Sequence, residues 1–405
     1  MCCEVPELKQ HAFLRRLWAV YRLVYVSYLF MVASAGVTFV FLEDVEQLYG
    51  IPPWGLGLIS SLAFFTAVIS AVLIAPLGDR GLLRALGIFA FATAIIGNVW
   101  IGFATELWSL AASRALGGLG VGVFAIVGRK ALIGETTDGG AEKIGGFVSA
   151  AVAGFIGGPA LGAWLGDLGG IETPYLAISA ALALLAAPTI KYLISVPIAV
   201  SERTTISTML PLFSSPNVRA ATAAYLAVFF NIGVFDATVD LYLSSLGASN
   251  AQVGLILIIV GAPLLFIPRL AGRAVDTSSR TMQYMLMALA IFVPIVLTLG
   301  FWEGLLVFTV LATFQTTMES VIFPAANRLV IDEAGAANSA VGTGMLDASG
   351  SLAAGFSALI APVLFDLTDG PLGSFGVSGL VSLGLAIIAW RNSTQTRQSA
   401  DAGLT

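Results

Sequence analysis

Residues 75–84 read Ala75-Pro-Leu-Gly-Asp79-Arg80-Gly-Leu-Leu-Arg84, a short charged break between two long apolar stretches. A bilayer span needs about 20 apolar residues, and stretches of roughly that length recur along the whole chain. With 58% hydrophobic residues and a mean hydropathy of +0.93, the chain holds more apolar side chain than a water-soluble fold buries. We therefore predict an all-α integral membrane protein, which excludes a soluble enzyme. Twelve spans are predicted, at Leu17–Leu42, Trp54–Leu77, Leu82–Phe103, Leu107–Ile133, Ile144–Leu165, Pro174–Ile194, Ala220–Ser244, Val253–Leu270, Met282–Leu299, Leu305–Val330, Ala340–Leu364 and Phe375–Trp390.

The basic residues predict how the chain is oriented. Of the nineteen Lys and Arg residues, all but Arg114 lie in every second gap between the apolar stretches. They are Lys9, Arg15, Arg16, Arg22, Arg80, Arg84, Arg129, Lys130, Lys143, Lys191, Arg203, Arg219, Arg269, Arg273, Arg280, Arg328, Arg391 and Arg397. Lys and Arg resist translocation, whereas the acids in the other gaps have little effect on orientation. We expect a multi-pass protein of the plasma membrane with both termini cytoplasmic.

The chain reads as two similar halves joined by a polar connection. Acids recur at offsets of 197, 198 and 199 residues, in the pairs Asp79 and Asp276, Glu135 and Glu333, and Asp167 and Asp366. We predict an N-terminal six-helix half at 1–194, a cytoplasmic linker at 195–219 and a C-terminal six-helix half with a short tail at 220–405. Halves related by an axis along the membrane normal are typical of secondary transporters that work by alternating access.

The opening stretch resembles the loop between helices 2 and 3 of the major facilitator superfamily, G-x-L-A-D-R-x-G-R-R, with Ala75 in place of the first glycine. The resemblance implies the major facilitator fold, two pseudo-symmetric six-helix bundles. An acid at a helix end beside arginines can pair across the cytoplasmic seam, so we predict a cytoplasmic gate here; the alternative is that these charges only set topology. The gate residues are Ala75, Gly78, Asp79, Arg80 and Arg84, with a degenerate second copy at Gly272, Asp276 and Arg280.

Arg114 stands within an apolar stretch, in Leu110-Ala-Ala-Ser-Arg114-Ala-Leu-Gly117-Gly118-Leu-Gly120. This is similar to the superfamily's L-x-x-x-R-x-x-q-G-x-G signature on the fourth helix, with Gly117 in place of the frequent Gln. An arginine inside a bilayer costs several kcal/mol unless it meets an acid or water. We therefore expect Arg114 to line a polar cavity.

The fifth predicted span is rich in glycine: Gly154-Phe-Ile-Gly157-Gly158-Pro159-Ala-Leu-Gly162. It resembles the g-x-x-x-G-P-x-x-G-G motif of the antiporter branch of the superfamily, the drug:proton exporters in particular. Small residues four apart let helices approach closely, and a proline can bend the span. The alternative is ordinary tight packing of a membrane helix, which Gly154, Gly158, Pro159 and Gly162 would serve equally.

Three acids are candidates inside predicted spans, Asp236, Glu319 and Asp347, and Asp240 lies one turn further out than Asp236 on the same face. In the superfamily, helices 1, 4, 7 and 10 line the central cavity, which would bring Arg114, Asp236 and Glu319 to it. A carboxyl group buried in a bilayer is poorly solvated when charged, so it can take up and release protons. Arg114 and the three candidate acids are the predicted proton-coupling or cavity residues, although Glu319 could instead hold a structural interhelix hydrogen bond. The cavity lining is expected to be apolar and aromatic, with candidates at Phe229, Phe230, Phe235 and Phe314.

The function predicted is proton-coupled efflux of small molecules by alternating access. Three intramembrane acids against one base favour a hydrophobic or cationic substrate, and proton-coupled uptake of a small metabolite is the alternative. A membrane prenyltransferase needs two acidic clusters, and Asp236 with Asp240 supplies only one; a non-transporting receptor is a further alternative. Because Cys2 and Cys3 are the only cysteines, no thiolate zinc site can be built, and we expect no metal and no cofactor. The expected partners are a small-molecule substrate, protons and the lipid bilayer, without nucleic acid, for a monomer.

Overall fold

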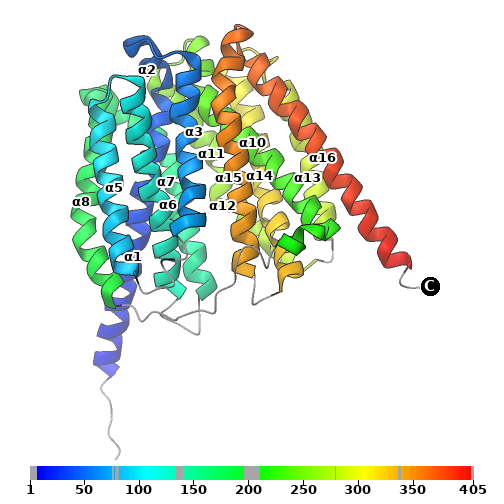
Figure 1. Cartoon of the computed structure of the whole chain (residues 1–405), viewed down its shortest axis with the longest axis horizontal. Helices are drawn as coiled ribbons and strands as arrows, with labels where there is room; N and C mark the ends of the chain where they lie inside the picture. Colours follow the sequence, from blue (N-terminus) through cyan, green and yellow to red (C-terminus); the bar gives the residue numbers. More distant parts are fainter. Residues whose placement is uncertain are drawn as a thin grey trace, which may run out of the picture.

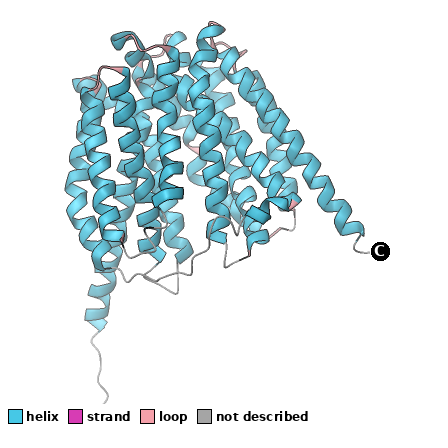
Figure 2. Cartoon of the chain, viewed as in Figure 1, coloured by secondary structure: helices cyan, strands magenta, loops and turns pink. Residues whose placement is uncertain are grey.

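The computed structural model describes residues 7–74, 77, 82–133, 140–195, 210–278, 280–335 and 339–402. Within these ranges the regular structure is helical throughout (Figure 2). Residues 7–195 contain α1 (Glu7–Val37), η1 (Thr38–Val40), α2 (Leu42–Tyr49), α3 (Pro53–Ile69), η2 (Ser70–Ile74), α5 (Leu83–Phe103), α6 (Leu107–Ile133), α7 (Gly140–Gly169) and α8 (Glu172–Ser195). Residues 210–402 contain η3 (Leu210–Ser214), α10 (Pro216–Ser245), α11 (Asn250–Gly261), α12 (Pro263–Asp276), α13 (Thr281–Leu299), α14 (Leu305–Ala334), α15 (Ser339–Leu367) and α16 (Pro371–Ala402). We call these ranges the first and second halves.

Twelve segments of the described chain are long and apolar enough to cross a membrane, which confirms the number of spans predicted. The eighth span differs most from the prediction, because it is built from two helices and runs Asn250–Asp276. α11 ends at Gly261 and α12 begins at Pro263. A proline has no backbone N–H to donate, so the helical hydrogen bonding is interrupted there. Hydropathy alone did not show this break.

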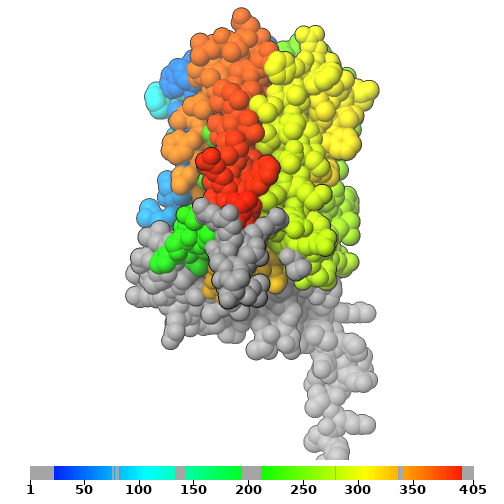
Figure 3. All heavy atoms as spheres, turned by 90° about the vertical axis from the view of Figure 1, so that its right-hand side faces the viewer, coloured from blue at the N-terminus to red at the C-terminus, as the bar shows by residue number. Residues whose placement is uncertain are grey.

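The two halves repeat the same helix pairings. α1 packs on α7 as α10 packs on α15, and α5 packs on α6 and α8 as α13 packs on α14 and α16. Figure 3 shows one of these pairs, α16 beside α13, on one side of the molecule. Between the halves, α3 packs on α15 and α11 packs on α7. The last two pairs also correspond to each other, since each joins the second span of one half to the fifth span of the other.

The ends of the bundle differ. α1 begins and α16 ends at one end, which we call the terminal face, while α2 lies at the other, the distal face (Figure 1). Near the distal face the halves meet closely: a Cβ placed on Gly57 of α3 would lie 2.2 Å from the carbonyl oxygen of Leu359 on α15. At the same face the Asp240 carboxylate accepts a 2.9 Å hydrogen bond from the Glu43 N–H. The seam between the halves is therefore closed at the distal face.

The outside of the bundle is apolar. Large side chains there are strongly exposed, among them Trp108 at 70%, Leu184 at 80% and Leu306 at 76%. Many large exposed apolar side chains on helices long enough to span a bilayer indicate a membrane-facing surface. The fold therefore places its polar and charged side chains either at the two faces or between the helices.

Candidate transport site

Two cavities lie between the helices at the centre of the described chain. The larger, which we call the main cavity, has a volume of about 370 Å³ and is walled chiefly by α1, α3, α5, α6 and α15. The smaller, the acidic cavity, has a volume of about 80 Å³ and is walled by α7, α10, α11, α12 and α14. The four candidate cavity residues divide between them: Arg114 and Asp347 line the main cavity, and Asp236 and Glu319 line the acidic cavity.

Arg114 lies two turns into α6 and is 6% exposed. Its Nη2 donates a 3.0 Å hydrogen bond to the Ala35 carbonyl oxygen on α1, and its guanidinium carbon lies 5.6 Å from the centre of the Phe39 ring. Its Nε has no hydrogen-bond partner. The Nη2 atom of Arg114 is thus fixed by a hydrogen bond, whereas its Nε donor has no partner in the cavity wall.

Asp347 lies near the terminal end of the main cavity, where it joins the two halves. Its Oδ2 is 3.9 Å from Nη2 of Arg129 on α6, and its Oδ1 accepts a 2.5 Å hydrogen bond from the Tyr225 hydroxyl on α10. The side chains of Arg129 and Asp347 are 47% and 41% exposed, whereas Tyr175 in the same cavity wall is 3% exposed. The main cavity is therefore open towards the terminal face and closed towards the distal face.

Arg129 is a cavity residue that the sequence analysis missed. The alternating charge pattern assigned it to a cytoplasmic gap, and the structure places it inside α6, in the wall of the main cavity. A signal was present, because the apolar stretch Leu107–Ile133 already contained this position. A basic residue near the end of a span can both set topology and line a cavity.

The acidic cavity holds two buried carboxyl groups. Asp236 is 4% exposed and Glu319 is 3% exposed. Glu319 Oε1 accepts a 3.1 Å hydrogen bond from Gln315 Nε2, one turn earlier on α14. Asp236 Oδ2 and Gln315 Oε1 have no hydrogen-bond partner, and the described residues that line this cavity include no Lys, Arg or His. The cavity thus offers acceptors without a resident cation.

Two aromatic rings are common to the cavities. Phe39 and Phe155 line both of them, and their ring centres lie 5.6 Å apart in an edge-to-face arrangement. The sequence analysis expected Arg114, Asp236 and Glu319 to share one central cavity. The structure instead divides them between two cavities that share this aromatic pair.

The aromatic candidates were only partly right. Phe229 lines the main cavity and Phe235 lines the acidic cavity. Phe314 is 57% exposed on the outside of α14, so its assignment to the lining was wrong. The sequence does not show whether a single aromatic residue on a long span faces the cavity or the outside of the bundle, because these spans are apolar on every side.

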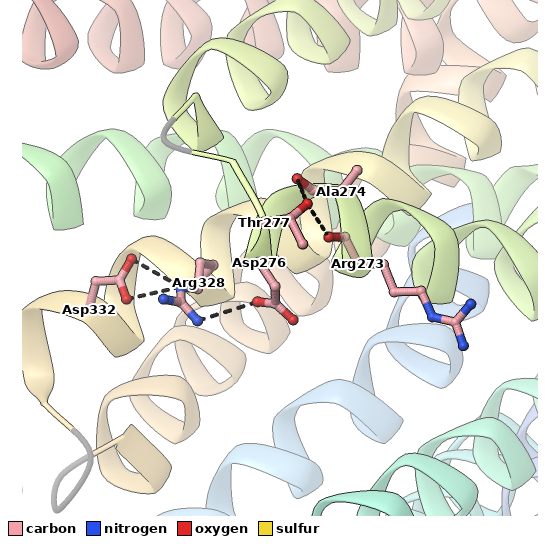
Figure 4. Close-up of polar contacts among 6 residues, drawn as sticks. All are labelled: Arg273, Ala274, Asp276, Thr277, Arg328 and Asp332. Carbon is pink, nitrogen blue, oxygen red and sulfur yellow. Dashed lines mark hydrogen bonds and ion pairs between the residues drawn. The ribbon is translucent and has the colours of Figure 1, made fainter.

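The second copy of the gate motif lies at the end of α12. Asp276 Oδ1 is 3.3 Å from Arg328 Nη1, and Arg328 Nε is 2.9 Å from Asp332 Oδ1, both on α14 (Figure 4). Among the described residues, the ion pair of Asp276 lies within its own half, whereas the motif predicted a pair across the seam. Exposed pairs of this kind contribute only about 0 to 1 kcal/mol.

Of the remaining gate residues, Arg84 is exposed in the first turn of α5, Gly272 lies on α12, and Arg280 precedes α13. Ala75, Gly78, Asp79 and Arg80 lie outside the described residues. The first copy of the motif therefore stays a prediction.

The glycines of α7 face α1. A Cβ on Gly154 would lie 2.2 Å from the Leu29 carbonyl oxygen, and one on Gly158 would lie 2.4 Å from the Ala33 carbonyl oxygen. Gly162 lies against Val37 and Val40, and Pro159 lines the acidic cavity. Close packing of α7 on α1 accounts for the spacing of these glycines, and the proline brings the same helix to the cavity.

A twelve-span bundle with cavities between two similarly packed halves defines a membrane transporter. The sequence matches the model of the Major Facilitator Superfamily twice, over residues 24–235 and 221–404. The chain belongs to this superfamily.

Solved structures with the same fold include a D-xylose-proton symporter, with a TM-score of 0.73 and 16% identity, covering 92% of this chain and 97% of that one. A bacterial homologue of the human lysosomal transporter Spinster, in an inward-facing and occupied conformation, has a TM-score of 0.74 and 12% identity, with 93% and 96% covered. No curated protein matches the sequence significantly. The family and these neighbours confirm the prediction of a transporter and not an enzyme.

Proposed function

We propose that this protein is a proton-coupled secondary transporter that exports amphipathic small molecules by alternating access. The observation that carries the proposal is the acidic cavity, where Glu319 and Asp236 are buried without a basic neighbour among the described lining residues. A buried carboxylate needs either a counter-ion or a proton, because its isolated charge is costly in a low-dielectric interior. A proton is the smallest ligand that satisfies this need.

Coupling follows from where the acids lie. Asp236 belongs to α10 and Glu319 to α14 of the second half, while Phe39, Phe155 and Pro159 of the first half complete the walls. A change in the relative position of the halves would therefore change which side the acids face. Because charged acids in a sealed cavity are costly, the halves would switch readily only when the acids carry protons or the cavity holds a substrate.

Export is favoured over uptake by the glycine-rich α7, which resembles the motif of the drug:proton antiporter branch. Proton-coupled uptake of a small metabolite is the alternative, and the fold shared with a D-xylose-proton symporter is compatible with it. The sequence favoured a hydrophobic or cationic substrate. That argument counted all intramembrane acids together, and it weakens once two of them lie apart from the main cavity. We place the protein in the plasma membrane with cytoplasmic termini and expect a monomer.

The test requires a substrate, which a growth or accumulation screen in a host without its own exporters would supply. The purified protein would then be reconstituted into proteoliposomes, and accumulation of that substrate measured under an imposed pH gradient. We expect accumulation against the substrate's concentration gradient, abolished by a protonophore. Uphill transport that is insensitive to the protonophore, or an absence of uphill transport, would contradict proton coupling. The direction relative to the proton gradient separates export from uptake.

A further inference from the structure

The charges in the wall of the main cavity do not balance. The charged residues among its described lining are Arg114, Arg129 and Asp347. Asp347 is already engaged, with Arg129 at 3.9 Å and the Tyr225 hydroxyl at 2.5 Å. Among the described residues that line this cavity, Arg114 is therefore a buried positive charge without an acid of its own.

The unpaired edge of Arg114 is built to receive an acceptor. The residue is 6% exposed, yet its Nε has no hydrogen-bond partner while its Nη2 is fixed on the Ala35 carbonyl oxygen. A second buried donor in the same wall, Nδ2 of Asn98 on α5, also has no partner. Buried polar groups are nearly always satisfied, so two unpartnered donors on residues that line one cavity indicate a ligand that brings acceptors.

The buried polar atoms without hydrogen-bond partners differ in kind between the two cavities. The main cavity has the donors Arg114 Nε and Asn98 Nδ2, whereas the acidic cavity has the acceptors Asp236 Oδ2 and Gln315 Oε1. Asp236 is the acid whose charge acts on Arg114, but it lines the other cavity, which shares Phe39 and Phe155 with the main cavity. No ion pair between Arg114 and Asp236 forms among the described residues, so a ligand in the main cavity can still supply acceptors to the arginine.

We propose that the main cavity binds an amphipathic organic anion whose carboxylate, sulfonate or phosphate group is held by Arg114. This inference rests on the proposed transport function and specifies its substrate class. A guanidinium presents donors in a planar fork that matches such groups and gives stronger bonds than a neutral donor. The apolar body of the ligand would pack on the aromatic wall formed by Phe39, Phe64, Phe155 and Phe229. An anion, and not the cation favoured by the sequence, is the ligand that this wall selects.

Binding can be tested without knowing the natural substrate, by using three probes with the same aromatic body. Naphthalene-2-sulfonate, naphthalen-2-ylmethanol and naphthalen-2-ylmethylammonium would be titrated by calorimetry into the full-length protein in nanodiscs, with empty nanodiscs subtracted. We expect the sulfonate to bind about tenfold or more tightly than the alcohol and the ammonium. Tighter binding of the ammonium, or equal binding of all three, would overturn the proposal.

Variants identify the group responsible. Arg114→Lys keeps the charge and loses the fork, so we expect sulfonate binding to weaken about tenfold while alcohol binding is unchanged. Arg328→Gln, which removes an arginine at the terminal face, is the matched control and should bind like the wild type. Sulfonate binding that survives in Arg114→Lys at full strength would contradict the assignment.

A second variant keeps the test informative if Arg114 substitutions unfold the protein. A Cβ on Gly117, one turn from Arg114 and in the same wall, meets no atom within 4 Å. Gly117→Leu should therefore fold and fill the cavity, so that binding of all three probes weakens. Unchanged sulfonate binding in Gly117→Leu would place the anion elsewhere.

The outcome is separable from that of the proposed function, because equilibrium binding needs no proton gradient. Selective sulfonate binding together with an absence of gradient-driven transport would refute proton coupling and leave the anion site standing. Protonophore-sensitive transport together with preference for the ammonium probe would support proton coupling and refute the anion site.

Discussion

At the scale of single residues, Glu319 is the group that we expect to carry the proton. Glu319→Gln keeps the size of the side chain and a hydrogen-bonding end towards Gln315, but it cannot exchange a proton. Uphill transport driven by a pH gradient should therefore be lost, while substrate counterflow between equal concentrations on both sides should persist. The measurement is flux into proteoliposomes with and without the gradient.

Ser320→Ala is the matched control for this substitution. Ser320 is the next residue on α14 and is fully buried, and its hydroxyl donates a hydrogen bond to the Thr316 carbonyl oxygen of its own helix. Its removal should leave coupling intact. If Glu319→Gln still accumulates substrate when the pH gradient is imposed, Glu319 does not carry the coupled proton, and Asp236 or Asp347 becomes the candidate.

The sequence predicted which charged residues lie between the helices more readily than how they are grouped there. Arg114, Asp236 and Glu319 stand out because a charged side chain in an apolar span is costly and therefore has a role. Their division between two cavities depends on how Phe39 and Phe155 meet, and these residues lie 116 positions apart in apolar sequence. Nothing local marks such a pair, so the partition could not be predicted.

At the scale of helices, close packing of α7 on α1 is the feature most open to a stability test. Gly158→Ala would put a methyl group 2.4 Å from the Ala33 carbonyl oxygen, and forcing an extra group into a packed interface costs about 1 to 3 kcal/mol. We expect a clear fall in the midpoint of thermal unfolding in nonionic detergent. The control is Gly157→Ala, because its Cβ would meet nothing within 4 Å and should leave the midpoint nearly unchanged. Equal midpoints for the two variants would contradict the interface.

The distal seam gives the fold a dependence on pH. Burial raises the pKa of Glu46 on α2, and the nearby Asp366 and Glu43 raise it further. The folded state then holds this proton more tightly than the unfolded state, so stability falls as the pH rises from the ordinary value of about 4.5 through the raised folded value.

Glu46→Gln should remove that fall in stability. We expect the variant to match the wild type below pH 4.5 and to be more stable above it, by less than about 1 kcal/mol because solvent screens the half-buried site. Unfolding midpoints would be measured across about pH 4 to 8. The difference between Glu46→Gln and the wild type should stay near zero at low pH and grow as the pH rises. Glu106→Gln is the control, because Glu106 is not among the acids that raise the pKa of Glu46. A Glu46→Gln variant that is less stable than the wild type at neutral pH would refute the repulsion.

Element boundaries were predicted well where hydropathy decides them and poorly where packing does. The span predicted at Leu107–Ile133 is the α6 that the structure shows. The eighth span was predicted as one uniform stretch, although Pro263 divides it into α11 and α12. Proline is common in membrane helices, and here only the structure shows that it starts a new one.

At the scale of the whole molecule, the described contacts define one conformational state. The halves meet through α3 with α15 and α7 with α11. The distal face is closed by contacts such as Gly57 with Leu359, and the main cavity is open where Arg129 and Asp347 are half exposed. The alternation of basic and acidic gaps predicts that the open, terminal face is cytoplasmic. Alternating access requires a second state in which this arrangement is reversed.

A single cysteine in the main cavity tests that requirement most directly. Ser351 on α15 lines the cavity one turn from Asp347, and Ser351→Cys is a conservative replacement in a background where Cys2 and Cys3 are changed to serine. Labelling with a membrane-impermeant thiol reagent would be followed in inside-out vesicles and in intact cells. We expect labelling in inside-out vesicles and little in intact cells at rest, with labelling in intact cells rising when a transported substrate is added. Labelling from one side only, whatever substrate is present, would contradict alternating access.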